Sequence, residues 1–77
     1  MEKLREYLNS LSPDEQKAFA DRCNTSVGYL RKAISQKELI REKTCTLIEI
    51  ESGSQVTRKD LRPDDWSEIW PELMEAA

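Results

Sequence analysis

The sequence predicts a small all-α domain of about five short helices, two of which form a helix-turn-helix. Residues 16–35 read as helix, tight turn, helix, and apolar residues recur at helical spacing both before and after this pair. The 77 residues suffice for one small core but not for two. We therefore expect one domain over 1–77, in which residues 62–77 form an acidic, tryptophan-containing C-terminal extension.

The first two helices have clear signals. Leu4, Tyr7, Leu8 and Leu11 follow the spacing i, i+3, i+4, i+7, which predicts an amphipathic helix over residues 2–10. The stretch Ser12-Pro13-Asp14-Glu15 combines an N-cap hydroxyl, proline at the first helical position and a glutamate that completes a capping box. We expect the second helix to begin there.

The turn of the helix pair is predicted at Asn24, because asparagine tolerates a left-handed backbone better than other non-glycine residues. Thr25 is expected to cap the following helix through its hydroxyl. Ala20 is expected where the two helices cross most closely. The apolar residues form one stripe on each helix, so both can close on one core: Phe19, Ala20 and Cys23, then Val27, Leu30 and Ile34.

The second half of the chain is less regular. Residues 35–37 are expected to form a loop, and residues 38–52 a helix that ends before Gly53. Thr57-Arg58-Lys59-Asp60 has the form of a capped helical turn, and Pro71 should divide the tail into two short turns. β-Branched residues between 44 and 58 leave an alternative open, an α+β fold with a C-terminal hairpin.

Charge is distributed unevenly along the chain. The net charge is −3, yet residues 1–59 carry 11 basic and 9 acidic side chains, whereas residues 60–77 carry 1 basic and 6 acidic ones. Residues 22–43 hold six basic side chains against two acidic ones. The overall acidity argues against nucleic-acid binding. The local excess matters more to a phosphate backbone, because screening confines surface charge to roughly 8–10 Å.

Several function classes are excluded by composition. The chain has no histidine and only two cysteines, Cys23 and Cys45, so we expect no metal site, and both thiols are expected in the core. No nucleophile–base pair or glycine-rich phosphate loop is present, so we expect neither catalysis nor a cofactor. No apolar run is long enough for a membrane span. The sequence predicts a soluble cytoplasmic protein.

In a helix-turn-helix protein the second helix enters the major groove of double-stranded DNA. Arg31 and Lys32 are the natural guanine readers, because guanine offers N7 and O6 as paired acceptors, and Gly28 would allow close approach. The structural alternative is a plain helical corner with a solvated basic face. The candidate base-reading residues are Ser26, Val27, Gly28, Arg31, Lys32 and Ser35, and the candidate DNA-backbone contacts are Gln16, Lys17, Thr25, Lys37, Arg41 and Lys43.

The tail allows two interpretations. Trp66, Ile69, Trp70 and Leu73 follow a helical stripe, which indicates either a lid on the core or a dimer or partner surface. We expect a homodimer, since one recognition helix contacts too few bases for useful specificity. The competing function is a protein-interaction module, in which the acidic tail grips a basic protein partner.

Certain residues also resemble a known family. Gln16, Ala20, the Asn24 turn, Leu30 and Ile34 match the pattern of the lambda-repressor-like helix-turn-helix, with asparagine in place of the commoner glycine. The stretches Cys-Asn-Thr-Ser-Val-Gly-Tyr-Leu-Arg-Lys, Ile-Glu-x-x-Ser-Gly and Val-Thr-Arg-Lys-Asp-Leu-Arg-Pro-Asp-Asp-Trp resemble Cro-like regulators of bacterial prophages, including YdaS-like antitoxins. Residues 36–40 depart from relatives that carry basic and proline residues there. The resemblance implies a mostly helical repressor of phage or prophage promoters, dimeric on a near-palindromic operator.

Overall fold

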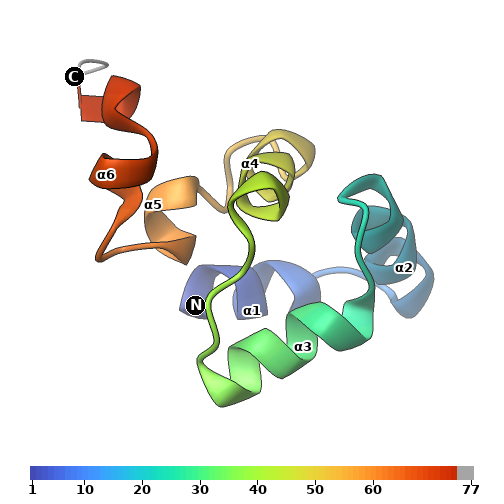
Figure 1. Ribbon diagram of the computed structural model, residues 1–77. Helices are drawn as coiled ribbons and strands as arrows, with labels where there is room; N and C mark the ends of the chain where they lie inside the picture. The colour runs from blue at the N-terminus through green and yellow to red at the C-terminus, as the bar shows by residue number, and fades with distance from the viewer. Residues whose placement is uncertain (75–77) are drawn as a thin grey trace.

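The computed structural model describes residues 1–74 and shows an all-helical chain (Figure 1). No strand occurs in these residues, so the segment 44–58 does not form the alternative hairpin. None of the helices described is long and apolar enough to cross a membrane. The elements are α1 (Glu2–Asn9), α2 (Pro13–Arg22), α3 (Val27–Gln36), α4 (Glu42–Glu51), α5 (Arg58–Leu61), α6 (Trp66–Ile69) and a 3-10 turn, η1 (Pro71–Met74).

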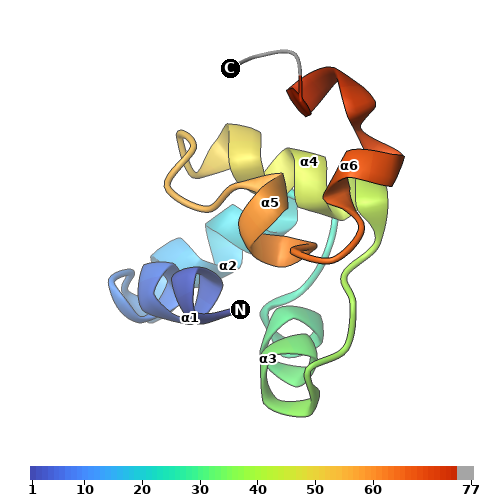
Figure 2. The same cartoon turned by 90° about the vertical axis from the view of Figure 1, so that its left-hand side faces the viewer.

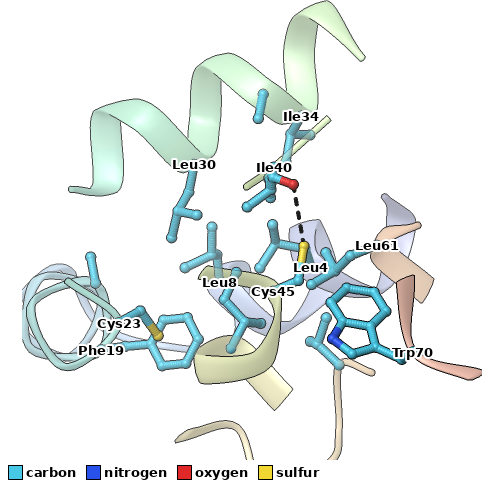
Figure 3. Close-up of a cluster of buried hydrophobic side chains, with 14 residues drawn as sticks. Leu4, Leu8, Phe19, Cys23, Leu30, Ile34, Ile40, Cys45, Leu61 and Trp70 are labelled. Carbon is cyan, nitrogen blue, oxygen red and sulfur yellow. Dashed lines mark hydrogen bonds between the residues drawn. The ribbon is translucent and has the colours of Figure 1, made fainter. Parts of the chain in front are cut away.

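One hydrophobic core joins α1 to α5, whereas α6 and η1 have no buried residue and pack against it with partly exposed side chains: Trp66, Ile69 and Leu73. Leu30 and Ile34 point from α3 toward Leu4 and Leu8 of α1 (Figure 3). The remaining buried apolar side chains are, in chain order, Phe19, Ala20, Cys23, Ala33, Ile40, Cys45, Ile48, Val56, Leu61 and Trp70, which follows α6 directly. The expectation that both cysteines are core residues is confirmed, and both are free thiols.

The start of α2 matches the sequence prediction. Ser12 Oγ accepts a hydrogen bond from the backbone N–H of Glu15 at 3.2 Å, and the Glu15 carboxylate accepts one from the backbone N–H of Ser12 at 2.8 Å. This reciprocal capping box satisfies two donors that the first turn of a helix leaves unpaired. Pro13 follows at the first helical position, where its missing N–H costs nothing.

The turn between α2 and α3 is built on Asn24, whose φ of 57° confirms the predicted left-handed backbone. The N–H of Thr25 donates to the Ala20 carbonyl at 3.0 Å, and the N–H of Asn24 donates to the Asp21 carbonyl at 3.0 Å. This pair of bonds is the Schellman pattern, which satisfies the last carbonyls of α2 and reverses the chain. Ala20 is buried beside the turn.

The predicted cap of α3 was wrong by one residue. Ser26, not Thr25, lies at the N-cap and accepts a hydrogen bond from the backbone N–H of Tyr29 at 3.1 Å. Thr25 is occupied in closing α2, so the first residue in extended conformation that faces the new helix is Ser26, with φ −129° and ψ 156°. Tyr29 is partly buried against the core.

The segment between α3 and α4 also differs from the prediction. Ser35 and Gln36 belong to α3, which ends at Lys37 with a left-handed φ of 55°. The helix predicted from residue 38 begins only at Glu42. Residues 38–41 stay outside the helices because the Ile40 side chain is fully buried while its carbonyl accepts hydrogen bonds from Arg62.

The C-terminal half follows the predicted short turns. Gly53, with φ 64°, ends α4, and Thr57 and Asp60 form the capping box of α5. The helix α6 ends at Ile69, before Pro71 opens η1. In both views α3 lies at the lower end of the molecule and α6 with η1 at the upper end (Figures 1 and 2). α3 and the last two elements of the chain therefore lie at opposite ends of the fold.

Candidate nucleic-acid interface

The outward face of α3 carries most of the predicted base-reading residues. Leu30, Ala33 and Ile34 turn into the core, where α3 packs against α1 and α2. The opposite side carries Gly28, Lys32 and Ser35, all exposed, with Arg31 partly exposed next to them. In both views α3 stands at the edge of the fold, with α4, α5 and the tail above it (Figures 1 and 2). The two cations of α3, Arg31 and Lys32, are thus accessible on this face.

The two serines and the valine have structural tasks as well. Ser26 Oγ caps α3, and Ser35 Oγ donates to the Lys32 carbonyl at 3.2 Å. Val27 is partly buried and packs against the core. The other three predicted base readers are Gly28, Arg31 and Lys32. Within residues 1–74 no structural contact of this kind occupies their side of α3.

Gly28 is not required by the packing of the fold. A Cβ placed on it would meet only Ser26 Oγ, at 3.9 Å, which is an ordinary van der Waals distance. Glycine in the middle of a helix costs about 0.5–1 kcal/mol relative to alanine, and Gly28 is the second residue of α3. The helix therefore carries a destabilising residue at a position where its own neighbours would accept a larger one.

The cations of this region have no acidic partners within the described part of the chain. The ion pairs found there use Arg5, Arg22, Arg58 and Arg62. None of them involves the six basic residues predicted to contact DNA, which are Lys17, Arg31, Lys32, Lys37, Arg41 and Lys43. Arginines elsewhere pair with carboxylates, whereas the cations around α3 form no such ion pair in residues 1–74.

The predicted DNA-backbone contacts come from three segments. Lys17 is exposed on α2, and Thr25 lies partly buried in the turn. Lys37, Arg41 and Lys43 are exposed along the segment that leaves α3 and enters α4. They extend the basic surface beyond the end of α3.

Gln16 has a role that the sequence did not predict. Its side-chain amide donates to the carbonyls of Leu8 at 2.9 Å and Leu11 at 3.1 Å, so both of its N–H groups serve the end of α1. These bonds fasten α1 to α2. A phosphate contact by this side chain would have to replace one of them.

In the tail, Trp70 belongs to the core and not to an outer surface. It is only 8% exposed, and the Arg58 guanidinium lies 5.4 Å from the centre of its ring. Its place in the predicted partner surface is therefore corrected. The other three residues of that surface, Trp66, Ile69 and Leu73, are partly buried against the core. Met74, at the end of the same helical stripe, is 61% exposed.

Arg62 is a second residue that sequence reasoning missed. Its side chain is only 10% exposed and contacts Asp65 at 2.9 Å and Glu42 at 3.3 Å. Burial would lower the pKa of Arg62, but the hydrogen bond and charge of Asp65 and the charge of Glu42 outweigh burial and raise it. The sequence does contain a signal that could have identified this residue: Arg62 is the single basic residue within the acidic segment 60–77.

The titratable groups of the core do not form a reactive site. Burial raises the pKa of Cys23 and of Cys45 to about 11, so both thiols are protonated at neutral pH. Residues 1–74 contain no cluster of histidine, cysteine or acidic side chains able to hold a metal ion. The basic face of α3 is therefore the candidate site with the clearest chemistry.

Comparisons with family models, curated proteins and solved structures find no match to this chain. The functional assignment therefore rests on the residues and their arrangement.

Proposed function

We propose that this protein is a sequence-specific regulator of transcription of the Cro type, which binds double-stranded DNA through α3 and represses a phage or prophage promoter. The observation that supports this most is the accessible face of α3, where unpaired cations surround a glycine that the fold does not need. A solvated helix face would gain stability from alanine at position 28. A helix that must approach a base edge gains room from glycine.

The roles of the individual side chains follow from groove chemistry. Arg31 can donate two hydrogen bonds to N7 and O6 of guanine, and Lys32 can bind the same acceptors as a point charge. Val27 can contact a thymine methyl group with the part of its side chain that the core leaves exposed. As the cap of α3, the Ser26 hydroxyl accepts a hydrogen bond from the Tyr29 backbone N–H. Its own O–H therefore remains available to donate to an acceptor on DNA.

The exposed cations around α3 supply the contacts that do not depend on sequence. Lys17 lies on α2, on one side, and Lys37 with Arg41 on the segment leaving α3, on the other. Each phosphate they neutralise releases counterions, which makes binding strong at low salt. We further propose that the protein acts as a homodimer on a near-palindromic operator in the bacterial cytoplasm, without catalysis or a cofactor.

The first test is selection of random-sequence DNA duplexes by the purified protein at moderate salt, followed by sequencing of the enriched pool. We expect an inverted repeat whose half-sites lie about 10 base pairs apart, because two recognition helices must meet successive turns of the major groove. The double variant Arg31→Ala and Lys32→Ala serves as the control and should lose this enrichment. A wild-type pool without any enriched sequence would contradict the proposal.

A second candidate function is an antitoxin or antirepressor that acts through protein contact. It is favoured by Met74, which is 61% exposed in an acidic tail at the end of the molecule opposite α3. Under this function Met74→Asp would release the partner and leave DNA selection unchanged. A protein that enriches no DNA but loses a bound basic partner on Met74→Asp would favour it over the first.

A further inference from the structure

The carbonyl oxygen of Ile40 is a meeting point of three hydrogen bonds. It accepts from Arg62 Nη2 at 2.7 Å and from Arg62 Nε at 3.1 Å, and Cys45 Sγ lies 3.4 Å away as a third, weaker donor. Figure 3 shows the contact between Cys45 and Ile40 above the core. A carbonyl with two charged donors is held much more firmly than one bound to water.

This contact fixes the segment that carries the basic residues. Residues 39 and 40 have no other hydrogen-bonded backbone group within the described chain, whose nearest such bonds are at Glu38 and Arg41. The Ile40 side chain is fully buried, so residue 40 is anchored on both its apolar and its polar side. Lys37 and Arg41, which flank the anchor, are exposed and lack acidic partners in residues 1–74.

Arg62 is itself held in place from the tail. Its Nη1 donates to Asp65 at 2.9 Å, and its Nη2 lies 3.3 Å from Glu42 at the start of α4. The guanidinium thus ties the acidic C-terminal segment, the entry to α4 and the segment leaving α3 to one point. Arg62, which follows Ile40 by 22 positions in the sequence, therefore holds the backbone of residues 37–41 in place.

We propose that Arg62 is a positioning residue for DNA binding, which holds residues 37–41 so that Lys37 and Arg41 contact the phosphates beside the groove entered by α3. The inference rests on the proposed DNA-binding function. Arg62 itself does not reach DNA, because its guanidinium is buried and paired. Its effect is therefore on phosphate contacts and not on base preference.

The test uses Arg62→Met, which keeps the aliphatic length but removes every donor. We expect the dissociation constant to rise about tenfold for the selected duplex and for a random duplex alike. The slope of log K against log salt should become shallower by about 1–2, as for the loss of one or two phosphate contacts, and the preferred bases should not change. Arg58→Met is the matched control, because it removes a partly buried arginine that fastens the tail without touching residues 37–41. It should lower stability and leave the salt slope unchanged.

A double-mutant comparison separates positioning from a general loss of folding. In a Lys37→Ala and Arg41→Ala background, Arg62→Met should weaken binding less than twofold, because the side chains it positions are gone. A full tenfold loss in that background, or an equal change of slope in Arg58→Met, would overturn the inference.

If circular dichroism shows that Arg62→Met does not fold, Arg62→Lys takes its place, since it keeps the positive charge but not the second donor arm of the guanidinium. A wild-type salt slope in the folded Arg62 variant would also overturn it.

These outcomes differ from a failure of the proposed function. If the wild-type protein shows no salt-dependent DNA binding, both the function and the inference fail. If it binds, and Arg31→Ala relaxes base preference while the Arg62 variant keeps the wild-type slope, the inference fails alone.

Discussion

Glu49 of α4 accepts three hydrogen bonds from Arg58 of α5. The backbone N–H of Arg58 lies 2.7 Å from Glu49 Oε1, and the guanidinium nitrogens lie 3.3 Å and 3.2 Å from the two carboxylate oxygens. The same guanidinium lies over the ring of Trp70. One carboxylate therefore orients the arginine that covers the buried tryptophan of the tail.

This relationship predicts a pH dependence of stability. Burial would raise the pKa of Glu49, but the hydrogen bonds and charge of Arg58 outweigh burial and hold the pKa below its usual 4.5. A carboxylate whose pKa is lower in the folded state stabilises the fold above pH about 4.5 and loses that contribution as pH falls through its folded-state pKa.

We therefore expect Glu49→Gln to lower the free energy of unfolding by about 1–3 kcal/mol at pH 7. Its difference from the wild type should shrink as the pH is lowered below 4.5, measured by urea unfolding across pH. Glu2→Gln, which removes an exposed pair with Arg5, is the control and should change stability by less than about 1 kcal/mol. A difference that is constant between pH 7 and pH 3 would contradict the assignment.

Asn24 should be sensitive to the shape of its replacement. Because its φ is 57°, we expect Asn24→Val to lower the free energy of unfolding by about 1–2 kcal/mol, whereas Asn24→Gly should match or exceed the wild type. Thermal unfolding would measure both. Asn9→Val, at an exposed position inside α1, should have a much smaller effect. Equal losses at both asparagines would show that the left-handed backbone is not the cause.

Arg31 should carry base specificity. We expect Arg31→Ala to weaken binding to the selected duplex by about 1–3 kcal/mol and to relax one base position, with little effect on random DNA. Fluorescence anisotropy with both duplexes would measure this. Lys3→Ala is the control, since Lys3 is an exposed cation on α1. Unchanged affinity in Arg31→Ala would mean that α3 does not read DNA in the proposed way.

Trp70 should be a stability residue and Met74 a surface residue. Trp70→Ala removes a large side chain that is 8% exposed, so we expect a loss of about 3–5 kcal/mol in denaturant unfolding. Met74→Ala should stay within about 0.5 kcal/mol of the wild type. Similar effects at the two positions would contradict the packing of the tail.

Deletion of residues 62–77 should unfold the domain, because it removes both Arg62 and Trp70 from the interior.

The sequence predicted the parts of the fold that depend on neighbouring residues. The capping boxes at Ser12 and Thr57 and the left-handed turn at Asn24 are local events, complete within about four residues. Such signals can be read without knowledge of the rest of the chain. The outward position of Arg31 and Lys32 on α3 also followed from helical spacing alone.

The errors arose where distant contacts compete with local preference. The helix predicted from residue 38 starts four residues later, because Arg62 takes the carbonyl of Ile40 from 22 positions away. The sequence also did not predict that the amide of Gln16 fastens the end of α1. The shift of the cap from Thr25 to Ser26 has a local cause, because the N–H of Thr25 already closes the end of α2. No local pattern in the sequence reports the contact between Arg62 and Ile40.

The position of the last acidic side chains has a kinetic consequence for the proposed function. Glu68 of α6 and Glu72 of η1 belong to the end of the molecule opposite α3. The longest dimension of the molecule is 37 Å, several times the screening length of roughly 8–10 Å in physiological salt. Those two carboxylates therefore do little to cancel the field of Arg31 and Lys32, despite the net charge of −3. If α3 binds DNA as proposed, a duplex that approaches from the side of α3 is favoured over one that approaches from the side of η1, and the orientation of the encounter is selected before any contact forms.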